Sequence, residues 1–421
     1  MVFNSIEHMK FVGEIADPIH KFIRFTDLEK KIIDSSVFQR LRRIKQLAGA
    51  HLVYPSAQHS RFEHSLGTMH VAGLAGEHLF SLGVIDKESI QELRIASLLH
   101  DIGHGPFSHL FEEALKVRGN KNHETLGGDI IRKTELNDIL SAFGYSARTI
   151  SEISFGNSKV KFKNEIISGS LSADLMDYLP RDGFFTGVEY GKVDYNRIIS
   201  SFRVTDNQSL ALDISSFYSF ESMIISRFEM FRAVYFHKTV RSAEVMLLHS
   251  ILLSSEELNL ARLSLNDYLK LTDDSILWMM SSSQNNKIAR EMITNYLERK
   301  LLKCVYERFI RKRDNYTKLN RDKIEELRLK IARLANIDER KIFLDTYGIS
   351  LVPLAPNKKE MKSILLVSED EFFKQPVSNL PLVNSITGYL DMIRVYTNHK
   401  DRKNITNISK DVLDKELPEK Q

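Results

Sequence analysis

Histidine is concentrated in one short part of this chain, and that concentration limits how the chain can fold. Nine of the 14 histidines lie between His51 and His123, although the chain has 421 residues. Each imidazole offers a lone pair near neutral pH, so histidine clusters are more typical of metal or acid–base chemistry than of packing. The fold is therefore expected to bring several segments of this region around one reactive site.

Helical periodicity dominates the chain up to residue 255. Apolar residues recur at helical spacing, and this predicts helices from Asp34 onward and over 62–83, 92–99, 108–117, 123–134, 173–179 and 217–254. The run Gly103-His104-Gly105-Pro106 must end the helix before it, because two glycines and a proline cannot continue a regular helix. Residues 1–30 are predicted to form an extended or hairpin lead-in.

The C-terminal part of the chain has a different character. Residues 256–340 look helical and lysine-rich, whereas KIFLDTYGISLVPL and KSILLVSEDEFF alternate and carry β-branched residues. We therefore predict a mainly α fold, with a helical core and a smaller α+β C-terminal appendage. The predicted units are the core over 1–255, a helical extension over 256–340, a strand-containing appendage over 341–397 and a mobile charged tail over 398–421.

Composition and charge exclude several classes of protein. No stretch approaches the roughly 18 unbroken apolar residues of a membrane span, and the N-terminal sequence lacks a signal-peptide pattern. A soluble, cytoplasmic protein is expected. The single cysteine, Cys304, excludes an internal disulfide and a cysteine-based metal site. A net charge of +4 tolerates anionic partners such as nucleotides or nucleic acid without proving either.

Two histidines and two aspartates form the strongest chemical pattern. They are His64 in RFEHS, His100 and Asp101 in LLHDIGHGPFSH, and Asp174 in SADLMDYLPRD. Two imidazoles and two carboxylates suit a divalent metal, with Fe, Mn, Zn, Ni or Mg all open as its identity. A single mid-helix histidine more often packs in a core. However, burying Asp101 after the apolar residues 96–99 costs several kcal/mol unless the carboxylate is paired or metal-bound.

This ordered set resembles the signature of the HD phosphohydrolase superfamily, whose members are all-helical metal-dependent phosphoesterases. The stretches FQRLRRIKQLAGAHLVYPSAQHSRFEHSLG and DYLPRDGFFTGVEYG are similar to its dNTP triphosphohydrolase branch. Within that branch the chain resembles proteins that combine a sterile-alpha-motif domain with the HD domain, here without the former. The likeness extends from residue 17 to residue 303. From there to residue 396 it is weaker and consists of a recognisable strand pattern. It implies hydrolysis of dNTPs to deoxynucleoside and triphosphate.

The resemblance also assigns roles to individual residues. His64, His100, Asp101 and Asp174 match the metal ligands. The residues that match the proton-transfer group are His104, His109 and His123, with Glu112 in place of the family's orienting aspartate. Those that match substrate contacts are Arg61 and Arg227 for the triphosphate, Gln46 and Asp182 for the 3′-hydroxyl, Leu47 beside the base, and Tyr178 and Tyr235 against the sugar. A second Mg²⁺ on the nucleotide phosphates is a further expectation.

The family also has activator sites for guanine nucleotides between the subunits of a dimer or tetramer, so GTP or dGTP and a homo-oligomer are expected partners. The matching positions are Asp34, Gln39 and Arg42 for the base, and Arg203, Lys238, Arg299 and Lys303 for the phosphates. Other activator cations are replaced by Gly13, Asp213 and Ser215, and Leu175 replaces a lysine that contacts substrate phosphate. In the absence of an activator, Asp34 and Arg42 would form an ordinary surface pair worth about 0.3–0.5 kcal/mol.

Two other functions stay open at this point. The metal site could act on GTP, a guanosine polyphosphate or a cyclic nucleotide, an alternative kept open by Leu175. A protein of another class would bind single-stranded nucleic acid through the basic residues 40–45 and the lysine-rich region 285–330, with a vestigial site.

Overall fold

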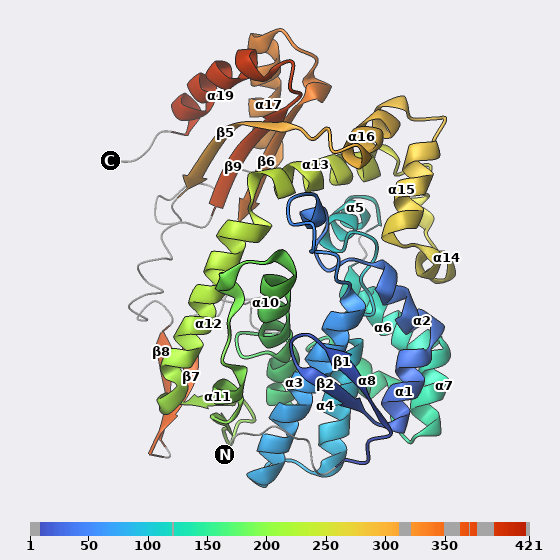
Figure 1. The fold of residues 1–421 in the computed structure, drawn as a ribbon, viewed down its shortest axis with the longest axis vertical. Coiled ribbons are helices and arrows are strands. Elements are labelled where there is room, and N and C mark those ends of the chain that lie inside the picture. Colours follow the sequence, from blue (N-terminus) through green and yellow to red (C-terminus); the bar gives the residue numbers. More distant parts are fainter. Residues whose placement is uncertain are drawn as a thin grey trace.

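The computed structural model describes residues 9–119, 122–310, 321–348, 363–369, 371–376 and 391–417. It shows a large helical body. A small unit of strands and helices from the C-terminal part of the chain lies at one end of that body (Figure 1). The predicted mainly α fold with a smaller α+β part is confirmed. In the described ranges, no helix has both the length and the apolar composition needed to cross a bilayer.

Three helices form the centre of the body. They are α3 (Arg61–Ser81), α4 (Lys87–Leu99) and α10 (Ala173–Thr186), and α3 packs against both of the others. A capping box fixes the start of α3, because the Ser60 hydroxyl and the Glu63 carboxylate each bond the other's backbone amide. At Gly76 an added Cβ would lie 3.2 Å from Ile90 Cγ2, so the missing side chain lets α4 approach closely.

Shorter elements surround this centre. The hairpin predicted for the lead-in is present as β1 (Gly13–Asp17) and β2 (Lys21–Phe25). The other short helices of the body are α1 (Asp27–Asp34), α2 (Ser36–Gln39), α5 (His109–Gly119), α6 (His123–Lys133), α7 (Glu135–Ala142), α8 (Ala147–Ser154), α9 (Lys161–Ile167) and α11 (Tyr195–Ile199). Short 3-10 turns cover Arg40–Arg43, Ala50–Leu52, Glu189–Gly191, Ile214–Ser216, Leu260–Arg262 and Glu339–Lys341.

The predicted start of a helix at Asp34 is wrong. Helix α1 ends at Asp34, and Ser35 is extended before the short helix α2. The Ser35 hydroxyl donates to Ile32 O and accepts from Phe38 N–H, so one side chain ends the first helix and begins the second. The apolar spacing continued across this break, and the spacing alone therefore concealed it.

The long helix predicted over 217–254 is also interrupted. Helix α12 (Phe217–Met230) passes into a π-helical turn, Phe231–Tyr235, before α13 (Lys238–Leu253) begins. The turn is closed by a bond of 2.8 Å from Phe236 N to Phe231 O. Wide turns of this kind are frequent at functional sites because they change which side chains face inward.

The region predicted as a helical extension contains a strand. Its helices are α14 (Leu265–Lys270), α15 (Asp273–Ser282), α16 (Lys287–Leu297) and α17 (Arg321–Ala335), but Lys303–Ile310 forms the strand β5. Strand β5 pairs with β9 (Asp391–Thr397), which also pairs with β6 (Ile342–Gly348). The segment KCVYERFI has β-branched and aromatic residues that favour a strand, and the surrounding lysines masked that preference.

The strands predicted for the appendage over 341–397 divide between two separate sheets. Strands β6 and β9 join β5, whereas β7 (Ser363–Ser368) and β8 (Glu371–Pro376) extend the sheet of β3 (Phe202–Val204) and β4 (Leu210–Asp213). Figure 1 shows β7 and β8 beside α12, far from β5 and β9. The appendage is therefore not one compact unit.

The predicted mobile tail over 398–421 is instead ordered in its described part. Helix α19 (Arg402–Glu416) packs against α17 and β5. Its buried side chains are Ile405, Ser409, Val412 and Leu413, which lie one helical turn apart. The prediction was wrong because the many charges of this segment occupy the opposite, solvent-facing side. Residues 418–421 lie outside the described residues.

We expect Leu413→Ala to destabilise the C-terminal unit by about 2–5 kcal/mol, because Leu413 is fully buried between α19 and its neighbours. The measurement is chemical denaturation, followed by limited proteolysis of the C-terminus. Lys410→Ala is the control, since Lys410 is an exposed residue of the same helix. Equal stability of the two variants would mean that the helix does not pack as described.

Candidate active site

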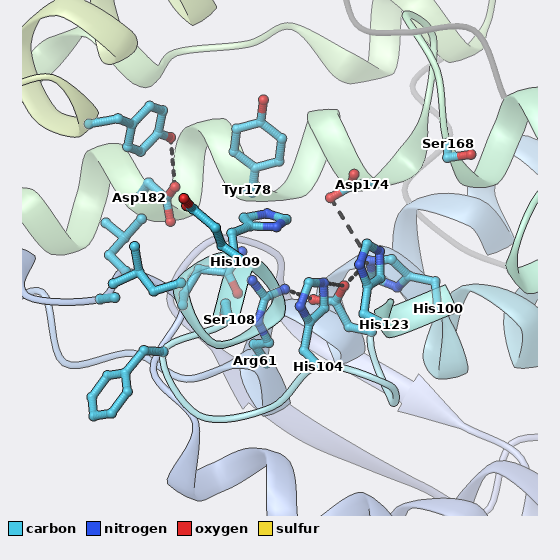
Figure 2. A pocket seen from close by; sticks show the side chains of 18 of the residues that line it. Arg61, His100, His104, Ser108, His109, His123, Ser168, Asp174, Tyr178 and Asp182 are labelled. Atoms are coloured by element: carbon cyan, nitrogen blue, oxygen red, sulfur yellow. Dashed lines mark hydrogen bonds and ion pairs between the residues drawn. The ribbon is translucent and has the colours of Figure 1, made fainter. Parts of the chain in front are cut away.

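One cavity of about 490 Å³ collects most of the residues selected from the sequence (Figure 2). Of the predicted proton-transfer and substrate residues, it is lined by Gln46, Leu47, Arg61, His104, His109, His123, Tyr178, Asp182, Arg227 and Tyr235. Three of the four predicted metal ligands, His100, Asp101 and Asp174, also face it. His64 and Glu112 are buried and act on the cavity through these neighbours.

The predicted metal ligands come together from three helices. His64 lies on α3, His100 and Asp101 follow the end of α4, and Asp174 is in the first turn of α10. His64 Nε2 lies 3.1 Å from Asp174 Oδ1 and 3.7 Å from Asp101 Oδ2. His100 Nε2 lies 3.3 Å from Asp101 Oδ1 and 3.9 Å from Asp174 Oδ1. His64, His100 and Asp101 thus group closely, and Asp174 adjoins them through both histidines.

The donor set fits a divalent metal ion. His100 Nε2 is buried and has no hydrogen-bond partner among the described residues. The other ring nitrogens are engaged, because His64 Nδ1 donates to Asp177 Oδ2 at 2.8 Å and His100 Nδ1 donates to Ser97 O at 2.7 Å. With Nδ1 engaged, each Nε2 is the nitrogen directed toward the carboxylates, and it would offer its lone pair to a metal once it carries no proton, as in metal-binding histidines. One ligand atom each from His64, His100 and Asp101 lie within 4.8 Å of one another.

The electrostatics of this cluster favour a cation. Burial alone would lower the pKa of His64, but its hydrogen bonds to Asp174 and Asp177 raise that pKa to about 10. Burial opposes ionisation of Asp101, yet the Arg61 guanidinium bonded to it holds the pKa of that carboxyl well below its usual range. The site therefore carries negative charge that a proton on His64 partly neutralises, and a metal ion would replace that proton.

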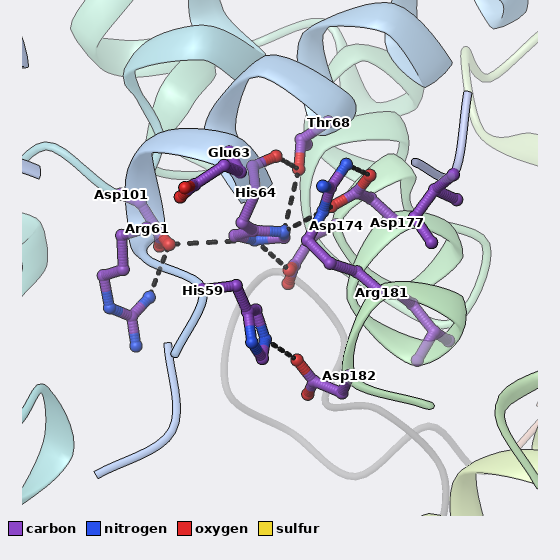
Figure 3. Close-up of polar contacts among 12 residues, drawn as sticks. His59, Arg61, Glu63, His64, Thr68, Asp101, Asp174, Asp177, Arg181 and Asp182 are labelled. Atoms are coloured by element: carbon purple, nitrogen blue, oxygen red, sulfur yellow. Dashed lines mark hydrogen bonds and ion pairs between the residues drawn. The ribbon is translucent and has the colours of Figure 1, made fainter. Parts of the chain in front are cut away.

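A buried network behind His64 was missed from the sequence. Asp177 accepts bonds from His64 and from Arg181 Nε and Nη2, the latter two at 2.9 Å each (Figure 3). It also accepts a bond from His20 Nε2 at 2.7 Å. Arg181 also donates to Asp17 at 2.8 Å, which ties the β1–β2 hairpin to the metal ligands. Asp177 follows Asp174 by three residues and precedes Arg181 by four, so helical spacing on α10 could have indicated it.

A glycine makes room for this network. At Gly67 an added Cβ would lie 1.8 Å from Asp177 Oδ1 and 2.4 Å from Arg181 Nη2. Because Gly67 is one turn from His64 on α3, the Asp177 carboxylate can lie directly against the helix that carries His64.

The second histidine group lies next to the predicted metal ligands. His104 Nε2 is 3.4 Å from Asp101 Oδ1, and the His104 and His123 rings stack at 4.2 Å. His123 Nδ1 donates to Glu112 Oε2 at 2.6 Å, so the glutamate at this position reaches the histidine that it was expected to orient. Burial and the nearby Arg61 hold the pKa of His104 well below its usual range, so this ring is neutral. His109 is largely exposed at the cavity.

The opposite wall carries the residues expected to contact the nucleotide. Asp182 accepts from Tyr235 OH at 2.6 Å and from His59 Nε2 at 2.7 Å. His59, which stacks on Phe185, was missed because its role depends on a contact with distant α10. The Arg227 guanidinium donates to Tyr178 OH at 2.5 Å, and its Nε has no partner among the described residues.

Other features of the cavity were also missed. Ser108 Oγ accepts from Arg61 Nε at 2.7 Å, and Arg241 and Glu244 contribute charges from α13. Leu175, which replaces a lysine of the family, is buried in the apolar core and does not line the cavity.

The residues matched to activator binding lie on separate elements. Asp34 pairs with Lys30 at 2.5 Å, and Arg42 donates to Gln39 at 2.8 Å. Arg203 lies on β3 and Arg299 donates to Leu52 O at 2.8 Å. Lys238 begins α13 and Lys303 begins β5. Of these seven residues, Lys238 lines a second cavity beside α12, and none lines the cavity of about 490 Å³.

Comparison with protein families matches two regions of the chain. The HD domain matches residues 61–182, and the HD associated region matches residues 193–421. The first match contains His64, His100, Asp101 and Asp174 together with the second histidine group, so it spans the whole of the metal-ligand set described above.

Individual relatives extend over most of the chain. An uncharacterised protein of Methanocaldococcus jannaschii is 32% identical over 385 residues, which cover 88% of this chain and 75% of that protein. A deoxynucleoside triphosphate triphosphohydrolase SAMHD1 homolog of Dictyostelium discoideum is 31% identical and covers 70% of this chain and 60% of that protein. The crystal structure of a hypothetical protein from Aquifex aeolicus superposes with a TM-score of 0.77 at 31% identity, covering 94% and 99% of the two chains.

We expect metal binding at pH 7.5 to release about one proton. The pKa of His64 is raised to about 10 in the metal-free site, so its Nε2 must lose a proton before it can bind a metal. Affinity should consequently increase with pH below about 10, by roughly tenfold per pH unit from this group alone. Calorimetric titration with Mn²⁺ in two buffers of different ionisation enthalpy measures the proton count. The exposed-site control His399→Gln should release the same number. Identical heats in both buffers would contradict the prediction.

We expect Asp177→Asn to weaken metal binding by roughly 10- to 100-fold, because an amide no longer holds His64 as a negatively charged acceptor does. His20→Gln, which keeps the bonds of Asp177 to His64 and Arg181, should weaken it less. Competition with a chelator measures affinity, and thermal melting checks the fold. Asp206→Asn, at an exposed aspartate, is the control. Unchanged affinity in a folded Asp177→Asn protein would exclude this role.

Proposed function

We propose that this chain, which belongs to the HD phosphohydrolase superfamily, cleaves deoxynucleoside triphosphates to a deoxynucleoside and inorganic triphosphate. The observation that carries the proposal is that Asp101 lies between the predicted metal-binding group and the predicted proton-transfer group. Its carboxylate faces the metal-binding histidines on one side and His104 on the other, within one cavity. The naming of relatives as deoxynucleoside triphosphate triphosphohydrolases supports the same substrate class.

The chemistry requires an attacking water and a protonated leaving group. A divalent metal held by His64, His100, Asp101 and Asp174 would supply a Lewis acid for the α-phosphate and lower the pKa of a bound water. Cleavage between the α-phosphorus and the 5′-oxygen expels an alkoxide, which needs a proton donor near neutral pH. His123 meets this need, because Glu112 holds its Nδ1 and leaves Nε2 to carry the transferred proton.

Two arginines of the cavity would bind the polyphosphate. Arg61 is fixed by Asp101 and Ser108, and Arg227 is fixed by Tyr178, so both planar groups are oriented before substrate arrives. The burial of Leu175 in the core means that this chain relies on fewer cations for the phosphates than the family pattern. A second Mg²⁺ on the substrate phosphates would compensate for that charge.

The sugar would lie between Tyr235 and Gln46. The Tyr235 hydroxyl is fixed by Asp182, and Gln46 Oε1 is buried without a partner among the described residues. An unsatisfied buried amide oxygen is costly, and a bond from a sugar hydroxyl would satisfy it. A tyrosine held against the ring favours deoxyribose over ribose because it leaves little room for a 2′-hydroxyl.

Activation by GTP or dGTP and assembly into a dimer or tetramer belong to the same proposal. The matched residues Asp34, Gln39, Arg42, Arg203, Lys238, Arg299 and Lys303 are dispersed over one chain, so a guanine-nucleotide site would need elements of a second subunit. That dependence would link nucleotide level to oligomer formation and activity.

We expect the metal-loaded protein to convert each dNTP to deoxynucleoside and intact triphosphate, as resolved by chromatography with and without GTP. His123→Ala should lower kcat by roughly 10²- to 10⁴-fold through loss of proton transfer. His100→Ala and Asp101→Ala should abolish turnover. His399→Gln is the control, because this exposed histidine lies outside the cavity.

The products and the sugar preference separate the alternatives. Turnover of GTP equal to that of dGTP, or release of orthophosphate or pyrophosphate with a nucleotide product, would move the reaction to another nucleotide or bond. No turnover with any metal or activator would overturn the proposal.

A further inference from the structure

The carboxylate of Asp273 joins two segments of the active site without lining the cavity itself. Asp273 begins α15, far along the chain from the histidine-rich region, and is buried. Its Oδ1 accepts from Phe107 N–H at 2.8 Å, and its Oδ2 accepts from Lys45 N–H at 3.0 Å. Each oxygen therefore holds a different backbone segment.

The first of these segments carries the substrate side of the cavity. Lys45 directly precedes Gln46 and Leu47, which line it. Its neighbours pair with the start of α3, because Arg61 N donates to Ile44 O at 2.9 Å and Gln46 N donates to His59 O at 3.0 Å. A shift of Lys45 would thus move Gln46 and the segment that bears the phosphate-side arginine.

The second segment carries the histidine loop and is held in an unfavourable backbone conformation. Phe107 and Ser108 both have φ of 53°, in the left-handed region that side-chain-bearing residues rarely adopt. Ser108 also accepts from Arg61 Nε, and His109 follows it at the cavity. Such a conformation persists only when surrounding contacts enforce it.

The segment before Asp273 supports the same loop at two further points. Tyr268 OH donates to Gly103 O at 2.7 Å. The buried Arg40 donates to His104 O at 2.8 Å, to Ile102 O at 3.0 Å and to Leu271 O at 3.4 Å. Arg40 thus links the loop to Leu271, in the turn between α14 and α15, and Asp273 at the end of that turn is the residue that also reaches the substrate-side segment.

We propose that Asp273 is a positioning residue: its carboxylate holds the backbones of Lys45 and Phe107 at a fixed separation, and so aligns the Gln46 segment with the histidine-bearing loop across the cavity. A neutral side chain with one acceptor oxygen can hold only one of the two amides. The kinetic part of this inference rests on the proposed function, whereas its structural part does not.

A positioning role and a purely structural role of Asp273 predict different effects of Asp273→Asn on melting temperature and on kinetics. Burial raises the pKa of Asp273 to about 6, so the native protein holds this charge at a cost. Asp273→Asn removes that cost but leaves one of the two backbone N–H groups without its acceptor, so the two effects offset and we expect a melting temperature close to that of the unmodified protein. We expect kcat/KM for dGTP to fall roughly 10- to 100-fold, the usual cost of one lost bond to a charged group, with changes in both kcat and KM.

The experiment compares Asp273→Asn with Asp274→Asn, a matched control at an exposed aspartate one residue further along α15. Hydrogen–deuterium exchange is followed in peptides over 44–48 and 102–109, beside dGTP kinetics. Faster exchange confined to these peptides in Asp273→Asn, and absent from the control, supports positioning. Unchanged exchange overturns it, as does a lower melting temperature with faster exchange throughout the protein. If the unmodified protein fails to cleave dGTP, the proposed function fails and the exchange result still decides the role of Asp273.

Discussion

The candidate active site is organised around the buried charge of Asp101. An ionised carboxylate in a protein interior is strongly unfavourable unless cations and donors surround it. Arg61 supplies the ion pair, while His64, His100 and His104 face the same two oxygens from three directions. The start of α3, the end of α4 and the following loop must therefore be placed together, and their placement defines the cavity. The β1–β2 hairpin adds to this through Asp17, Arg181 and Asp177.

The sequence was most informative where a functional group is local. His100, Asp101 and His104 are encoded in one short stretch, and Asp174 begins a helix with a clear cap. The contributions of His20, His59 and Asp273 could not be anticipated in the same way. His20 and Asp177 are 157 positions apart, and Lys45 and Asp273 are 228 apart. Such contacts depend on how distant segments pack together. The periodicity of apolar residues within one helix does not indicate which distant residue that helix will contact.

The helices predicted from the sequence are largely present in the structure. The predictions were less accurate for the ends of the helices and for the C-terminal part of the chain. Apolar composition over long segments predicted the central helices α3 and α4, which are buried on most sides, and α10. It missed the break at Ser35, which depends on a capping hydroxyl, and the strand β5, whose partner β9 lies much later in the chain. It also missed α19, whose buried stripe is narrow relative to its charged surface.

The parallel pairing of β4 with β7 has a consequence for biosynthesis. Leu212 pairs with Leu366 and Asp213 with Val367, so a strand of the helical body gains its neighbour only after most of the chain has left the ribosome. Contacts between distant segments form late because closing a long loop costs chain entropy. During synthesis, the β3–β4 hairpin is an open sheet edge that can pair with other chains. Pairing with β7 therefore covers the free edge of β4 only when the C-terminal part has been made.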